Sequence, residues 1–365
     1  MAKREPIIIS KVRENILKNE LIQDGDKIVL GLSGGPDSVF LAYVLEYLKK
    51  SFKEKNNIEY DIIICHINHM IREEAEQDEL LAKKYADKYG YNFYSLHTDV
   101  KALAKENKIS EEECGRNVRY EFFNKILEEN DATKIAVAHN AGDNAETVLH
   151  NFMRGAGLNG LCGISVKNGN IIRPILNVKK DEIIEYLDEN RIEYNIDRTN
   201  KELIYTRNKI RNDLIPKIEN EYNPNIIDTI NRMAEKISED MEFIDSLAKE
   251  EYSKMIINKT RNSIRLNIRD FKNKNKAIKS RVILLAINEI LGTIKGIESP
   301  HLEEISNLFD NSITGKKFEI GNKFVINIER NKVANITKNV KFWYVKVLWI
   351  SVFLLKTDLK YDKVV

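Results

Sequence analysis

The chain has 365 residues, of which 42% are hydrophobic and 31% charged, an ordinary balance for a soluble globular protein. The formal net charge of +2 does not by itself indicate a nucleic-acid-binding protein, so a basic surface would have to be local. This length allows two or three packed domains.

Three cysteines, Cys65, Cys114 and Cys162, lie far apart and form no Cys-x-x-Cys pair. Their spacing argues against a disulfide framework or a structural zinc site. The N-terminal apolar run is too short for a signal peptide, and no run reaches membrane-spanning length. We therefore expect a cytoplasmic protein with reduced thiols and no membrane contact.

The first half of the chain alternates between strand and helix patterns. Apolar runs predict strands at residues 27–33, 60–68, 92–100 and 134–140, and helical spacing predicts helices at 38–50, 73–90, 116–129 and 143–153. This alternation predicts an α/β fold with a doubly wound, mainly parallel sheet. We place this domain at residues 1–215.

The pattern changes from about residue 216, where prolines punctuate the chain and long helical patterns follow. We expect a helical domain at 216–298. Within it, residues 254–281 carry ten Lys or Arg against one Asp. Residues 318–338 then alternate in strand fashion, which predicts a small α+β domain at 299–365.

The end of the chain is unusual for a closing strand. Residues 342–355 are apolar and aromatic, with Lys346 as the one charge, and the segment is too short for a normal transmembrane helix. Polar alternation is weak, so an exposed strand here would be prone to aggregation. We therefore expect the last two dozen residues, about 340–365, to be atypical and the C-terminal domain to be incomplete.

A glycine-rich turn lies between the first predicted strand and helix, and it comprises Ser33, Gly34, Gly35, Pro36, Asp37 and Ser38. Glycines let the backbone approach an anion, and the helix N-terminus offers free N–H groups. Because no Lys-Ser or Lys-Thr pair follows, the turn is not a standard nucleoside triphosphatase loop. Asp37 would repel phosphate unless Mg²⁺ lies between them. The alternative is a tight turn in which Asp37 or Ser38 caps the helix.

This hexapeptide resembles the SGGxDS loop of the N-type ATP pyrophosphatases, also called the PP-loop or adenine nucleotide alpha hydrolase-like fold. The resemblance implies that the loop binds ATP and that the bond between the α and β phosphates is cleaved. An acceptor oxygen then receives AMP, and pyrophosphate leaves.

Further motifs follow in chain order. They are HINHMIR (66–72), ECGRNVRYEFF (113–123), HNAGDNAET (139–147), RGAGL (154–158), RP (173–174), DRTN (197–200) and TRNKIR (206–211). Together they are similar to the motifs of the tRNA(Ile)-lysidine synthetase family, over about residues 25–215. Asn68 departs from that family, which more often has Asp there, so the resemblance assigns no role to this position.

The resemblance implies a two-step reaction. ATP, with Mg²⁺, adenylates the C2 carbonyl oxygen of the wobble cytidine in the CAU anticodon of tRNA(Ile). The ε-amine of free L-lysine then attacks C2, and AMP leaves. The resemblance leaves a homodimer open.

The acids Asp143 and Glu146 are three residues apart on a predicted helix, so they share a face. One is expected to hold Mg²⁺ together with Asp37, and the other to bind the lysine ammonium or act as the base. We assign Asp143 to the metal and both acids to lysine, and which of them is the base stays open. The alternative is favourable negative charge at a helix N-terminus.

Arg116 and Arg119 are one helical turn apart and are expected to brace the α-phosphate, the alternative being a solvated helix face. His66 and His139 are expected to contact ATP. A metal pair of His66 and His69 is the alternative, but no third ligand is evident.

Basic residues are expected to bind tRNA phosphates. They are Arg154, Arg207, Lys209, Arg211, Lys272, Lys274 and Lys276. The alternative for such a charge run is a solvated surface.

Three other functions are alternatives to this one. A tRNA thiolase would use paired cysteines or an iron–sulfur cluster, and an amidotransferase would need a glutaminase domain. A third alternative is a catalytically inactive RNA-binding protein. The intact acids Asp37, Asp143 and Glu146 argue against an inactive protein.

Overall fold

The computed structural model describes residues 5–68, 75–195, 206–321, 323–339 and 362–364. Contacts divide the chain into two units, Met1–Ile237 with Leu359–Val365 (unit 1) and Ser238–Asp358 (unit 2). The domain boundaries expected after residues 215 and 298 remain predictions. In the part of the chain that the structure describes, no helix is long and apolar enough to cross a bilayer.

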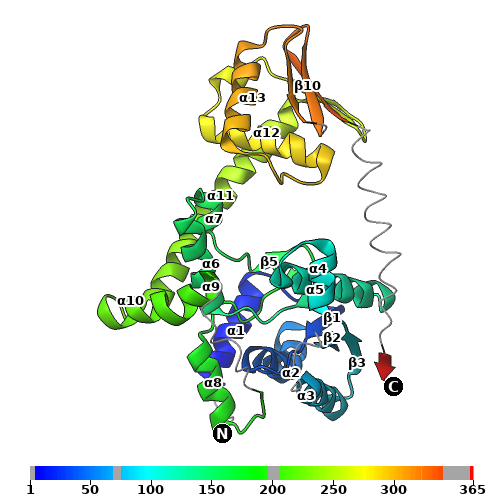
Figure 1. Ribbon diagram of the computed structural model, residues 1–365, viewed down its shortest axis with the longest axis vertical. Helices are drawn as coiled ribbons and strands as arrows, with labels where there is room; N and C mark the ends of the chain where they lie inside the picture. The colour runs from blue at the N-terminus through cyan, green and yellow to red at the C-terminus, as the bar shows by residue number, and fades with distance from the viewer. Residues whose placement is uncertain (1–4, 69–74, 196–205, 322, 340–361, 365) are drawn as a thin grey trace. The chain divides into compact units, whose positions relative to one another are not determined.

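Unit 1 is built on a seven-stranded sheet. Its strands are β1 (Asp26–Gly31), β2 (Tyr60–Asn68), β3 (Asn92–His97), β4 (Lys134–Ala136), β5 (Lys167–Asn168), β6 (Ile171–Ile172) and β12 (Asp362–Val364). Their order is β12-β3-β2-β1-β4-β6-β5. The pairs β3–β2, β2–β1, β1–β4 and β4–β6 are parallel, whereas β12 and β5 pair antiparallel. The predicted doubly wound, mainly parallel sheet is confirmed (Figure 1).

The helices of unit 1 alternate with these strands. They are α1 (Ile7–Lys18), α2 (Pro36–Asn56), α3 (Ala75–Tyr89), α4 (Val100–Asn107), α5 (Glu111–Glu129), α6 (Ala141–Met153), α7 (Leu158–Leu161), α8 (Lys180–Glu189), α9 (Thr206–Lys209) and α10 (Ile215–Glu221). A π-helical turn, Ile210–Leu214, joins α9 to α10. The long helix α11 (Ile226–Met255) follows.

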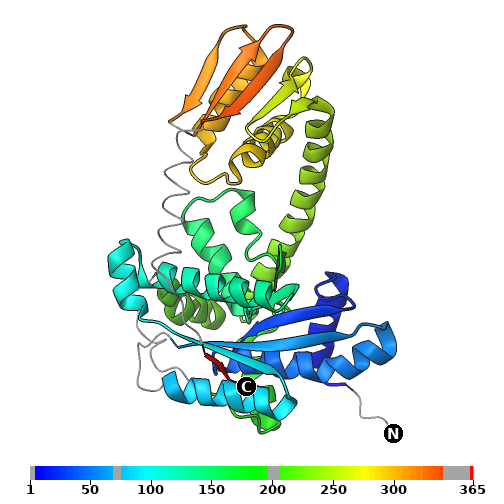
Figure 2. The same cartoon turned by 90° about the vertical axis from the view of Figure 1, so that its right-hand side faces the viewer.

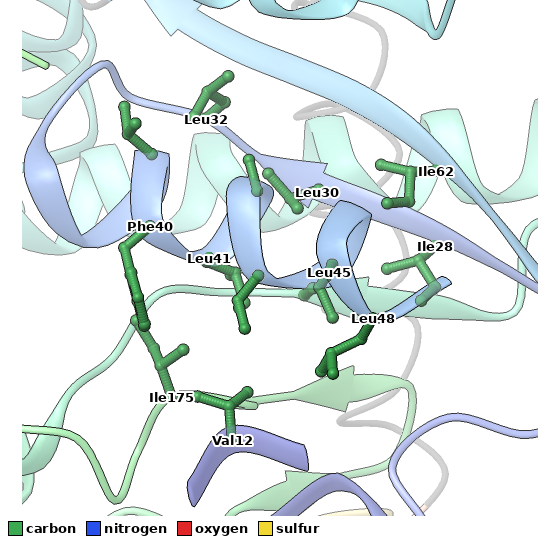
Figure 3. Packing of buried hydrophobic residues seen from close by; sticks show 14 of the residues in the cluster. Val12, Ile28, Leu30, Leu32, Phe40, Leu41, Leu45, Leu48, Ile62 and Ile175 are labelled. Carbon is green, nitrogen blue, oxygen red and sulfur yellow. The ribbon is translucent and has the colours of Figure 1, made fainter. Parts of the chain in front are cut away.

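Alternating side chains of the strands face two separate cores. Ile28 and Leu30 of β1 pack with α1, α2, α3 and α8 on one face, and Figure 3 shows them against Leu41 and Leu45 of α2. Val29, between them, faces the core formed with α4 and α5. A two-residue period with apolar residues on both sides is what a sheet covered on both faces requires.

Two predicted strands are shorter than expected because each ends where a polar residue caps the next helix. Strand β3 ends at His97, and the carboxylate of Asp99 accepts a hydrogen bond from the N–H of Ala102 to begin α4. Strand β4 ends at Ala136, and Asn140 caps α6. The helices α1 and α4 were not predicted.

The strand order reverses between β1 and β4. The chain leaves β1 toward β2 on one side, whereas β4 lies on the other side and continues to β6. The loop after β1 leads into α2 and the loop after β4 leads into α6. In doubly wound sheets, ligands bind at the carboxyl ends of the strands at such a switch point.

Unit 2 contains a five-stranded antiparallel sheet in the order β7-β8-β11-β10-β9. Its strands are β7 (Ile256–Lys259), β8 (Ser263–Asn267), β9 (Lys317–Ile320), β10 (Phe324–Glu329) and β11 (Val333–Lys338), drawn in yellow-green to orange in Figure 2. Helices α12 (Lys276–Leu291) and α13 (Ser299–Asn311) share one apolar core with it.

The strand pattern predicted at 318–338 is confirmed, and Asn331 in the last turn has φ +63°. The strands β7 and β8 were not predicted. The apolar segment expected at 342–355 lies outside the described residues.

Candidate active site

The glycine-rich turn connects β1 to the N-terminus of α2. Gly34 has φ +83°, and a Cβ there would lie 2.8 Å from Oδ1 and 3.2 Å from Cα of Asp78, so only glycine fits without a shift. Gly35 caps α2 in an extended conformation, and Pro36 occupies the first helical position. The turn therefore presents the free N–H groups of a helix N-terminus, which suits an anion.

The two serines of the turn have different surroundings. The buried Ser38 hydroxyl donates to the carbonyl of Gly35 over 2.9 Å and accepts from the N–H of Ser33 over 3.1 Å. Ser38 thus shapes the loop. Ser33 is exposed, with its hydroxyl 3.1 Å from that of Ser38, and it can also reach a ligand.

Asn140 connects the two loops that meet at the switch point. Its side-chain N–H donates to Oδ1 of Asp37 over 3.0 Å, and its Oδ1 accepts from the N–H of Asp143 over 3.1 Å. In return, Oδ2 of Asp143 accepts from the N–H of Asn140 over 3.0 Å, which completes a capping box. One buried amide therefore sets the distance between two of the predicted catalytic acids.

Asp37 has a carboxylate oxygen available to a ligand. Burial raises its pKa, and the hydrogen bond from Asn140 and the charge of Lys180 only partly oppose that shift. Among the described residues, its Oδ2 has no hydrogen-bond partner. A partly desolvated carboxylate with a free oxygen is suited to a cation.

The acid pair on α6 is occupied by an arginine. Arg211 donates to Oε1 of Glu146 over 2.5 Å, to Oε2 of Glu146 over 2.9 Å and to Oδ1 of Asp143 over 2.6 Å. Burial raises the pKa of Glu146 even though Arg211 opposes this. Burial would lower the pKa of Arg211, but bonding to Glu146 and the charges of the acids outweigh it and raise that pKa. The sequence predicts that Arg211 contacts tRNA, whereas its side chain bonds to Glu146 and Asp143 of the predicted lysine site.

The charges of three arginines, together with that of Asp143, act on His139. Arg173 is buried and donates from Nε to Nδ1 of His139 over 3.2 Å, so the neutral ring carries its proton on Nε2. Burial, joined by the charges of Arg173, Arg116 and Arg119, lowers the pKa of His139 to about 4. The guanidinium of Arg116 also lies 5.0 Å from the ring centroid of Tyr120. Such a set of donors suits a phosphoryl group.

His66 lies at the end of β2 and has the opposite tautomer. Its Nδ1–H donates to the carbonyl of Leu32 over 2.8 Å, and the ring is 3% exposed. Burial lowers its pKa, so the ring is neutral. Its buried Nε2 is an acceptor without a partner among the described residues. His69, the alternative metal partner, lies outside those residues.

The basic residues predicted for tRNA in unit 1 are spread out. Arg154 is exposed at the end of α6, next to the exposed side chains of Phe152 and Met153. Arg207 forms an ion pair of 2.9 Å with Glu112, and Lys209 is exposed.

In unit 2, most cations of residues 254–281 are paired with acids from elsewhere in the sequence. Seven of the ten form ion pairs: Lys254, Lys259, Arg265, Lys274, Lys276, Lys279 and Arg281. The remaining three, Arg261, Arg269 and Lys272, are exposed and have no ion pair within the described ranges. Of the predicted tRNA contacts, Lys274 pairs with Glu251, Lys276 pairs with Glu303 over 3.1 Å, and Lys272 is unpaired.

Three residues near the acids had no role in the predictions from the sequence: Asn140, Arg173 and Lys180. Asn140 could have been found from the Asn-x-x-Asp capping pattern before a helix. Arg173 belongs to the Arg-Pro motif at 173–174, but its hydrogen bond to His139 and the effect of the Lys180 charge on Asp37 depend on tertiary structure, which no local signal marks.

Comparison with known proteins shows what the chain is similar to. Residues 7–218 match the model of the PP-loop domain. The chain is 39% identical over 345 residues to a tRNA(Ile)-lysidine synthase of Clostridioides difficile (strain 630), covering 93% of this chain and 73% of that protein. It is 40% identical over 311 residues to a tRNA(Ile)-lysidine synthase of Clostridium tetani, covering 85% and 65%.

Among solved structures, the fold is similar to a U34-tRNA thiolase from Methanococcus maripaludis that holds a [4Fe-4S] cluster. The TM-score is 0.51 at 22% identity, covering 64% of this chain and 78% of that one. This likeness concerns the fold alone. In this chain Cys65 of β2 and Cys114 of α5 are buried in the same apolar core, where burial raises the pKa of both thiols.

Proposed function

The chain belongs to the tRNA(Ile)-lysidine synthase family of PP-loop proteins, and we propose that it joins L-lysine to C2 of the wobble cytidine of tRNA(Ile) with a CAU anticodon. ATP is converted to AMP and pyrophosphate. The observation that carries this proposal is the meeting, through Asn140, of the PP-loop acid Asp37 with the acids of α6.

In the first step, the oxygen on C2 of the cytidine attacks the α-phosphorus of ATP. A bond forms from that oxygen to phosphorus, the α–β phosphoanhydride breaks, and pyrophosphate leaves. Gly34, Gly35 and the first turn of α2 hold the phosphates, with Ser33 as a further donor. Arg116 and Arg119 stabilise negative charge that builds on the α-phosphate. His139 offers an Nε2–H donor and His66 an Nε2 acceptor, so the two rings suit different groups of the nucleotide.

The residues present fit Mg²⁺. Asp37 offers a free oxygen, and Asp143 is held beside it by the same asparagine. Mg²⁺ is usually bound through one or two carboxylates together with substrate phosphates, and it neutralises phosphate charge. Asp37 and Asp143 are therefore the residues that would hold it.

In the second step, the ε-amine of lysine attacks C2, and the C2–O bond to AMP breaks. The amine needs a negative site to bind as ammonium and a base to lose protons before attack. Glu146, buried and with a raised pKa, is suited to both tasks. Asp143 is the second acid of this lysine site.

Exposed cations are suited to the tRNA backbone. They are Arg154, Arg207 and Lys209 in unit 1, and Arg261, Arg269 and Lys272 in unit 2. Arg207, Lys274 and Lys276 contribute less than the others, because each already has an acidic partner.

The test is pyrophosphate release and lysine incorporation, measured with tRNA(Ile) carrying CAU and with a tRNA carrying a different anticodon. We expect lysine-dependent product with the first tRNA alone. Pyrophosphate release that needs neither lysine nor the CAU tRNA, or tRNA binding without any turnover, would reject the proposal.

A further inference from the structure

We propose that Arg211 is a resident counter-ion, whose guanidinium occupies the place that the ammonium group of the substrate lysine takes, so that lysine binds by displacing it. This inference rests on the proposed function. It adds that a side chain of the protein itself competes with lysine for the two acids.

The contacts of Arg211 are those that a cationic substrate would make. Its guanidinium reaches both oxygens of Glu146 and one oxygen of Asp143 over 2.5 to 2.9 Å. Nε and Nη2 form a bidentate fork on Glu146, and Nη2 also donates to Asp143, and bidentate arginine–carboxylate pairs are among the strong hydrogen-bonded ion pairs. While this fork is in place, both oxygens of Glu146 and Oδ1 of Asp143 are already bonded to a cation, with which the ammonium of lysine has to compete.

The charge balance explains why a resident cation is needed. Glu146 is 6% exposed, and the charges of Asp143 and Asp37 also act on Arg211. Removal of Arg211 would leave these three acids with the more distant charges of Lys180, which acts on Asp37, and of Arg207, which acts on Glu146. An unpaired buried carboxylate is costly, so the emptied site would favour another cation.

The backbone that carries Arg211 is anchored, while its side chain has a way out. Ile210 and Leu214 of the π-helical turn pack with Ala145 and Val148 of α6. The side chain of Arg211 is 35% exposed, so it can move into solvent without unfolding the turn. Single π-helical turns are frequent at functional sites.

The test compares the lysine KM of the full chain with that of Arg211→Gln, which removes the charge. We expect the KM to fall by about tenfold, the change produced by 1.4 kcal/mol of relieved competition. Arg211→Lys keeps a cation but cannot span both acids, so its KM should fall by less. Arg232→Gln, which changes an exposed arginine of α11 without an ion pair in the described parts of the chain, should leave the KM unchanged.

Added guanidinium ion, at millimolar concentration, gives an independent readout. It should compete with lysine in equilibrium binding to Arg211→Gln, and far less in the wild type, where the site is filled. A higher lysine KM in both Arg211 variants would overturn the inference and make Arg211 a permanent part of the lysine site. If Arg211→Gln does not fold, Arg211→Lys gives the answer: a lower lysine KM supports the inference, and a higher one overturns it. Wild-type protein without lysine-dependent product would reject the proposed function instead.

Discussion

Asn140 donates a hydrogen bond to Asp37 across 3.0 Å, between the loops that follow β1 and β4. The same amide group caps α6, so the position of Asp37 is coupled to the helix that carries Asp143 and Glu146. Two roles of one side chain, capping and positioning, can be separated by substitution.

Asn140→Ser should keep the cap and lose the donor to Asp37. Serine caps a helix about as well as asparagine, so thermal stability should stay near that of the wild type. Pyrophosphate release should fall by about 10²-fold, the usual cost of a misplaced reacting group. Asn140→Ala, which loses both roles, should also be destabilised by about 1 kcal/mol. A Ser variant with wild-type turnover would show that Asn140 acts as a cap alone.

Asp37→Asn removes the negative charge from the glycine-rich turn with little change of shape. We expect AMP formation to be nearly abolished, because Mg²⁺ bound at the proposed site would lose a carboxylate ligand, while tRNA affinity stays close to wild type. Asp61→Asn, an exposed aspartate of β2, is the control for a surface charge. Unchanged turnover in Asp37→Asn would exclude this role.

The lysine step should depend on pH through Glu146. Burial raises the pKa of Glu146, and lysine needs the ionised form. The kcat/KM for lysine should therefore be full above that raised pKa and fall tenfold per pH unit below it. In Arg211→Gln the midpoint should move to higher pH, because Arg211 lowers the pKa of this acid. An unchanged midpoint in that variant would contradict the assignment.

Unpaired and paired lysines of the basic segment should differ in their effect on tRNA binding. Lys272→Ala should reduce the slope of log affinity against log salt by about 0.7 to 0.9, the value for one lost phosphate contact. Lys274→Ala should change it by less, because Lys274 pairs with Glu251. Equal slopes for Lys272→Ala and the wild type would indicate a solvated surface.

Lys279 belongs to the same basic segment but should serve stability. Its ammonium lies 2.8 Å from both oxygens of Asp310, and the residue is 9% exposed. Lys279→Met leaves Asp310 unpaired and should cost about 2–3 kcal/mol of unfolding free energy in urea titrations. Lys276→Met, which breaks the exposed pair with Glu303, should cost less than about 1 kcal/mol. An equal loss of unfolding free energy in Lys279→Met and Lys276→Met would refute the structural role of Lys279.

Much of unit 1 could be predicted because the spacing of apolar residues along β1 and α2 matches the residues that are buried in the structure. The acids Asp37, Asp143 and Glu146 were predicted for one site from motifs at strand ends. The position of Arg211 could not be predicted, because it depends on how the π-helical turn packs on α6. Arg211 is 65 residues from Glu146 in the sequence. The charge count over 254–281 was also incomplete, since Asp245, Glu303, Asp310 and Glu329, which neutralise it, lie outside that window.

The strand order of unit 2 also determines when that unit can fold during synthesis. Strand β8 ends at Asn267, but its inner neighbour β11 begins only at Val333, after α12, α13, β9 and β10 have been made. Until then the hairpin of β7 and β8 has an open edge, and a two-stranded hairpin alone is marginal in water. Closing so distant a pair is slow, since loop entropy is lost before the contact forms. The nascent chain should therefore hold strands β1 to β6 of the catalytic sheet folded while the second sheet still awaits its central strand, and the edge strand β12 is made last of all.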